Sequence, residues 1–184
     1  MNRPRSSFLL VLLTILLAAA SPAPAAGAPF ALRVSDKGIE LACGSMGSFT
    51  LEFPSLDLGD GKKHAPVETR VQGASASLAY EGGGRIGVSA ASGKIVFSFE
   101  NMPANVSAFT SEFLIAPNYG EGGTWRTDDQ SGSFPKDKPA KPQLFQGHSR
   151  RFSFADINTT RLSCALPEYT YVQLQDNREW NWNT

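Results

Sequence analysis

The sequence predicts an all-β protein, an antiparallel β-sandwich of jelly-roll or immunoglobulin-like kind that follows an N-terminal signal peptide. Three observations lead to this prediction. Apolar and polar residues alternate through about ten short segments, with the period of half-buried strands. Turn residues separate these segments roughly every 8–12 residues. Beyond the N-terminal apolar run, no segment has the spacing of an amphipathic helix.

Residues 1–28 are organised like a bacterial signal peptide. Arg3 and Arg5 precede an apolar run, and Ala23-Pro24-Ala25 then matches a signal peptidase site. The apolar run is shorter than the ~20 residues that a membrane span requires. We therefore expect cleavage near Ala25 or Ala26, a secreted or periplasmic protein, and no membrane span in the mature chain.

The first strands of the mature chain are expected over residues 30–35, 39–43 and 49–53. In each of them every second residue is apolar, as in Ile39, Leu41 and Cys43, and Pro54 ends the series. A polar loop then covers residues 56–66.

Next, the alternation predicts a meander over residues 67–80, 85–90 and 94–100. Gly82-Gly83-Gly84 and Ser92-Gly93 form its turns, and Ile95, Phe97 and Phe99 mark the clearest strand of the chain. A further apolar strand is expected over residues 108–116.

Closing strands are expected over residues 151–157, 161–166 and 169–175, which ends a domain at 29–175. Residues 176–184 then form a tail or a truncated linker. Before these strands, residues 117–149 read as one long loop that contains several aromatic residues. Loops of this length are usually functional or disordered, and disordered segments are poor in aromatic residues. We expect this loop to pack partly over the sandwich.

Charge gives no reason to expect nucleic acid or an anionic membrane as a partner. Arg3 and Arg5 are the only charged residues of the leader, so 17 basic residues become 15 in the mature chain, against 17 acidic residues. The two histidines lack partners at metal-ligand spacing. No cofactor is expected, but a structural calcium ion remains an alternative, with Asp57, Asp60 and Gly61 as its candidate ligands.

Two cysteines remain in the mature chain, Cys43 and Cys164, each on the apolar face of its expected strand. Export allows a disulfide between them, and two buried thiols are the alternative.

Aromatic residues give the stronger functional signal, because exposed rings stack on the apolar faces of sugars while amides and charges bind hydroxyl groups. If Val172 and Leu174 point into the core, Tyr169, Tyr171 and Gln173 point outward. Their outward neighbours on the preceding strands would include Arg161, Ser163, Arg151 and Ser153. The candidate ligand-binding residues are Tyr119, Trp125, Arg161, Tyr169, Tyr171 and Gln173. A further layer of protein over this face is the alternative.

The Phe-rich alternation and the closing Gln-Leu-Gln-Asp-Asn-Arg-Glu-Trp-Asn-Trp resemble the N-terminal β-sandwich accessory module of secreted bacterial polysaccharide-active enzymes. This resemblance implies a downstream catalytic domain as partner, with Trp180 and Trp182 at the junction. It supplies no catalytic motif for this chain.

The sequence therefore favours a non-catalytic, exported module that binds carbohydrate or supports a carbohydrate-active enzyme. One alternative is a structural or adhesive surface module that binds protein. Another is a small glycan hydrolase that uses loop carboxylates such as Asp128, Asp129, Asp176 and Glu179.

Overall fold

The computed structural model describes residues 13–19, 31–42, 48–91, 93–115, 122–156 and 161–180. Within these ranges, fifteen strands form three antiparallel sheets, so the all-β prediction is confirmed. The only helix in these ranges is the 3-10 helix η2 (Asn177–Trp180). None of the described helices could span a membrane.

The largest sheet has nine strands. Their order is β13 (Ser131–Ser133), β12 (Thr124–Arg126), β14 (Gln143–Ala155), β15 (Arg161–Gln175), β1 (Leu13–Ala19), β9 (Lys94–Glu100), β8 (Arg85–Ala91), β7 (Ser75–Ala79) and β6 (Glu68–Gln72). A four-stranded sheet has the order β11 (Phe113–Leu114), β4 (Ser48–Glu52), β3 (Gly38–Ala42) and β2 (Ala31–Val34). The third sheet pairs β10 (Ala108–Thr110) with β5 (Ser55–Asp57).

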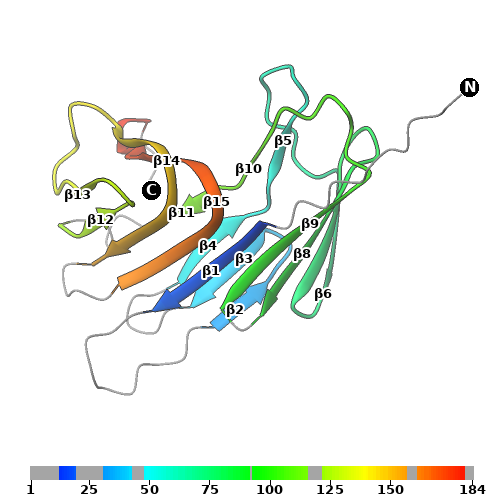
Figure 1. Cartoon of the computed structure of the whole chain (residues 1–184), viewed down its shortest axis with the longest axis horizontal. Coiled ribbons are helices and arrows are strands. Elements are labelled where there is room, and N and C mark those ends of the chain that lie inside the picture. Colours follow the sequence, from blue (N-terminus) through cyan, green and yellow to red (C-terminus); the bar gives the residue numbers. More distant parts are fainter. Residues whose placement is uncertain are drawn as a thin grey trace, which may run out of the picture.

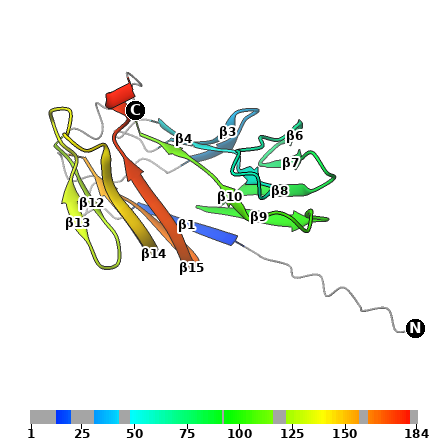
Figure 2. The same ribbon diagram turned by 90° about the horizontal axis from the view of Figure 1, so that it is seen from above.

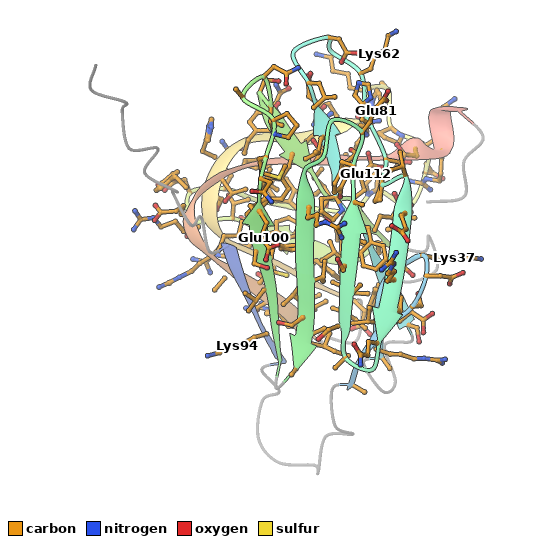
Figure 3. The ribbon with its side chains drawn as sticks, turned by 90° about the vertical axis from the view of Figure 1, so that its right-hand side faces the viewer. Lys37, Lys62, Glu81, Lys94, Glu100 and Glu112 are labelled. Carbon is orange, nitrogen blue, oxygen red and sulfur yellow. The ribbon has the colours of Figure 1, made fainter. Side chains whose placement is uncertain are left out.

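One hydrophobic core joins the nine-stranded and four-stranded sheets. Ile39 and Leu41 of β3 are fully buried, as are Ile86 of β8 and Phe97 of β9. Figures 1 and 2 show β3 and β4 lying over one side of β8 and β9, while the β14–β15 pair curves away at the other end of the molecule. Figure 3 shows β9, β8 and their neighbours from the opposite side, with Lys94 and Glu100 at the two ends of β9.

Several expected boundaries change in the structure. The strand expected at 67–80 is a hairpin, β6 and β7, because the chain turns at Gly73 with a φ of 60°. That left-handed conformation suits glycine. The strand expected at 108–116 contributes to two different sheets, through β10 and β11. The two expected strands at 161–166 and 169–175 are one strand, β15.

The expectation of an irregular loop at 117–149 is wrong for nearly half of the described part of that range. It contains β12, β13 and the first half of β14. The three-residue strands β12 and β13 pair with each other, with Trp125 opposite Gly132, and β12 also pairs with β14. Such short strands carry little apolar alternation, and the inward position of β13, opposite Trp125, is a glycine.

β1 lies inside the segment that the sequence assigns to the signal peptide. Its backbone pairs with β15, with Leu16 opposite Ala165, and with β9, with Leu13 opposite Phe97. In this chain it therefore lies at an interior position of the nine-stranded sheet. Cleavage of the signal peptide stays a prediction.

Candidate functional site

The β14–β15 pair is the longest antiparallel ribbon of the fold and contains most of the predicted binding residues. Its register runs from Gln143 opposite Gln175 to Ala155 opposite Arg161. The register shifts by three residues between Ser149 and Arg151, where only Arg150 of β14 but four residues of β15, 166–169, lie between the paired positions, so the ribbon has a bulge there. A bulge bends its strand and redirects the side chains that follow.

This bulge keeps the same side of the ribbon facing outward along its length. On the core side, β14 has Phe145 before the bulge and Phe154 after it, positions of opposite parity. In β15 the core side keeps one parity, since Leu162, Val172 and Leu174 all pack against the core. The opposite side, here called the outer face, is therefore continuous from one end of the ribbon to the other. Its residues are Gln146, His148, Arg150, Arg151 and Ser153 of β14, and Arg161, Ser163, Ala165, Tyr169, Tyr171 and Gln173 of β15.

Two tyrosine rings stand on this outer face. Tyr169 is 54% exposed and Tyr171 is 50% exposed, so neither is covered by another layer within the described residues. The Arg150 guanidinium carbon lies 5.3 Å from the centre of the Tyr169 ring, a cation–π arrangement. The His148 ring meets the Tyr171 ring edge to face at 5.5 Å. Both rings are thus oriented by a neighbour while remaining accessible.

Amide groups continue the outer face beyond the tyrosines. Gln173 lies opposite Gln146, and its Nε2 donates to Gln143 Oε1 at 2.9 Å and to Gln175 Oε1 at 2.8 Å. This orients the Gln173 side chain, whose carbonyl oxygen has no recorded donor among the described residues. Such a group can accept a hydrogen bond from a ligand hydroxyl.

A pocket of about 410 Å³ opens at the other end of the outer face. Arg161 lies here, together with Arg126 of β12 and Arg151 of β14, and all three are exposed. Ser153 and Ser163 lie opposite each other between them. The outward neighbours expected from the sequence, Arg151, Ser153, Arg161 and Ser163, therefore meet in one pocket.

Asp128 holds the turn after β12 against β14 at the bulge of the ribbon. Its Oδ2 accepts hydrogen bonds from the Arg150 N–H at 2.6 Å and from the Ser149 hydroxyl at 3.1 Å. The Arg150 N–H bond is the main reason why the pKa of Asp128 is lowered. Asp128 is therefore an ionised structural acceptor at the edge of the pocket.

Trp125 does not lie on the outer face. Its ring is buried, so it is not available to stack on a sugar as the sequence suggested. It is only 7% exposed, and its ring lies 5.5 Å from that of Phe145. In β12 it pairs with Phe154, whose side chain is also in the core. Strand alternation thus turns Trp125 inward and its neighbour Arg126 outward.

Two other predictions fall on residues outside the described ranges. Tyr119 is one of them, and Cys43 is the other, so the disulfide stays a prediction. Cys164 lies half-buried on the core side of β15, opposite Phe152.

The suggested calcium loop is organised by backbone donors. Asp57 Oδ1 accepts from the N–H groups of Gly59 and Gly61, at 2.8 and 3.2 Å. Asp60 accepts from the Lys62 N–H and contacts His64 Nε2 at 3.0 Å. Within the described residues, no three His, Cys, Asp or Glu side chains gather as a metal site would need.

Of the carboxylates considered for glycan hydrolysis, Asp176 is tied to Arg178. The Arg178 Nη2 lies 2.6 Å from Asp176 Oδ2, and this hydrogen bond lowers the pKa of Asp176. Arg178 also donates to the backbone carbonyls of Pro135, Lys136 and Asp137. A general acid needs a raised pKa, so neither Asp176 nor Asp128 suits that role. The contact instead attaches the start of the expected tail to residues 135–137.

Sequence reasoning missed Arg126, Gln146 and His148, which lie inside the segment expected to be a loop, and Arg150, which directly follows it. Extending the alternation from Phe152 and Phe154 back through β14 fails at the bulge, so no pattern marked His148 as a neighbour of Tyr171. Comparisons with protein-family models, curated proteins and solved structures found no match to this chain.

Proposed function

We propose that this chain is a non-catalytic, exported β-sandwich of jelly-roll or immunoglobulin-like kind, and that the outer face of its β14–β15 ribbon binds carbohydrate. In the same proposal, the chain acts as an accessory module of a bacterial carbohydrate-active enzyme, with a catalytic domain as partner. The sequence resemblance and the predicted signal peptide support this second part.

One observation carries the binding proposal, the pair of half-exposed rings of Tyr169 and Tyr171. Large exposed apolar side chains are few in the described residues, and the others are Val67 and Val71. Tyr169 and Tyr171 are two positions apart in β15, so their Cα atoms are about 7 Å apart along the strand. Both rings project from the same face, as a chain of sugar rings would require.

The neighbours of these rings suit the same ligand. Arg150 and His148 hold the rings from one side, while Gln146 and Gln173 place amides beside them. Apolar ring faces with a few oriented polar groups are the usual composition of a small-ligand site.

The test is retention of the purified chain on insoluble polysaccharides, compared with a variant that carries Tyr169→Ala and Tyr171→Ala. The wild-type chain should be retained and the variant should be lost from the bound fraction. Val71→Ala, which removes exposed apolar surface from β6, is the matched control and should leave retention unchanged.

Retention that survives removal of both rings would refute stacking on this face. Absence of retention on every polysaccharide would favour the alternative of a surface module that binds protein.

A further inference from the structure

Three arginines surround the pocket at the β12 end of the outer face. Arg126 lies opposite Ser153, which lies opposite Ser163, so a guanidinium and two hydroxyl groups form a row across three strands. Arg151 is two residues from Ser153 on one side of this row. Arg161 is two residues from Ser163 on the other side. The arginines therefore enclose the two serines from three directions.

Strand geometry places the Cα atoms of these arginines about 8 to 14 Å apart, close enough for their long side chains to reach one ligand. Within the described residues, no carboxylate forms a recorded ion pair with Arg126 or Arg161. The charge of Arg151 helps to lower the pKa of Asp128, so Arg126 and Arg161 are the two charges here without such a partner in the described part of the chain, and like charges of this kind attract anions. The guanidinium group also matches carboxylate and sulfate oxygens in a two-pronged geometry.

The pocket has a positive balance although the chain as a whole does not. Asp128 is the one carboxylate among the residues that line it, against Arg126, Arg151 and Arg161. Its Oδ2 already accepts hydrogen bonds from Arg150 N–H and the Ser149 hydroxyl. The three guanidinium groups thus outnumber the carboxylate.

We propose that this pocket binds an acidic sugar unit, one that carries a carboxylate or a sulfate group, so that the polysaccharide recognised by the outer face is anionic. This inference rests on the proposed function and specifies its ligand. The arginines bind the anionic group, and the hydroxyls of Ser153 and Ser163 bind sugar hydroxyls. The tyrosines lie further along the same face of the ribbon and hold neighbouring units of the chain.

The experiment compares polymers with the same sugar backbone that differ in whether they carry an anionic group. Polygalacturonate is paired with its fully methyl-esterified form, and dextran sulfate is paired with dextran. Polyglutamate serves as an anionic polymer without sugar. Affinity is measured by titration calorimetry at two salt concentrations for the wild-type chain, Arg126→Gln, Arg161→Gln and the control Arg33→Gln. Arg33 is exposed on β2, in the other sheet, and its change removes the same charge.

The wild-type chain should bind at least one charged polymer about tenfold more tightly than its neutral partner, because hydrogen bonds to charged groups are stronger than neutral ones. Arg126→Gln and Arg161→Gln should each weaken that binding about fivefold and leave neutral binding unchanged. Arg33→Gln should change neither. The polygalacturonate and dextran sulfate pairs show whether the carboxylate or the sulfate is the recognised group.

Equal affinity for charged and neutral polymers would overturn this inference and leave the proposed function standing. Failure to bind any polysaccharide would remove both. Binding of polyglutamate as tightly as the acidic polysaccharides would refute recognition of a sugar unit in the pocket. Because Arg126 and Arg161 are exposed, both variants should fold, and unchanged circular dichroism spectra check this.

Discussion

Replacing Trp125 by Ala should strongly destabilise the fold, although the residue lies in a segment with few apolar residues. The Trp125 ring is 7% exposed and packs 5.5 Å from the Phe145 ring. Removing a buried aromatic side chain costs about 3–5 kcal/mol of unfolding free energy. For a domain of this size that is a fall in Tm of roughly 6–20 °C. By contrast, Tyr171→Ala on the outer face should cost less than about 0.5 kcal/mol.

Gly132 allows a sharper version of this test. A Cβ at Gly132 would lie 2.7 Å from the ring carbon Cζ2 of Trp125, too close for van der Waals contact. Gly132→Ala should therefore displace the ring and cost about 1–3 kcal/mol in the wild-type chain. In the Trp125→Ala background the added methyl group enters the vacated space, so the same change should cost little or even stabilise.

The assay is urea unfolding of the four chains of this double-mutant cycle, followed by far-ultraviolet circular dichroism because two of the chains lack Trp125, one of the three Trp residues, so their fluorescence signals differ. The coupling free energy between the two positions should be at least about 1 kcal/mol. Gly132→Ala that costs the same in both backgrounds would show that Trp125 does not cover Gly132. A cost below about 1 kcal/mol for Trp125→Ala would show that its ring is not part of the core.

Three further predictions follow from other contacts. Tyr80→Phe should lower the free energy of unfolding in urea by about 1 kcal/mol, because the buried Tyr80 hydroxyl donates to the Pro54 carbonyl, which would lose its donor. An unchanged urea midpoint would contradict this hydrogen bond. Because the pKa of Asp176 is lowered in the folded state, its ionised form adds stability that is fully present above about pH 4 and is lost as the pH falls through the lowered pKa. Asp176→Asn should therefore make the free energy of unfolding less dependent on pH below 4. Urea unfolding of both chains at pH 6 and pH 3 measures this. Equal pH dependence in the two chains would show that Arg178 does not hold this carboxylate. In a chain that lacks residues 1–28, hydrogen exchange should become faster at the amides of Lys94–Phe97 in β9 that face β1 rather than β8. Unchanged exchange at these amides would contradict the pairing of β1 with β9.

Strands with a strict alternation were predictable from the sequence. β8 and β9 lie where Ile86, Val88, Ile95 and Phe97 predict them, because both strands have one face in the core and one face toward solvent. The outward direction of Tyr169 and Tyr171 followed from the same rule, applied to Val172.

The remainder depended on features with no local pattern. The bulge at Ser149–Arg151 reverses the alternation of β14, so extending the pattern from Phe154 toward Phe145 gives the wrong face. Trp125 resembled an exposed loop aromatic because its strand has only three residues, and what buries it is Phe145, twenty positions away in sequence. The arginine pocket likewise needs the pairing of β12 with β14, which turn signals do not specify.

The position of β1 has a consequence for the maturation of the protein. Removing an interior strand does not shorten a sheet; it divides the sheet into two, each with a new edge of unpaired N–H and C=O groups. If the predicted leader is removed, β6–β9 and the β12–β15 group would face each other across one strand width. The precursor would then have fewer exposed edges than the mature protein, and export would create two edges able to accept a strand from another chain.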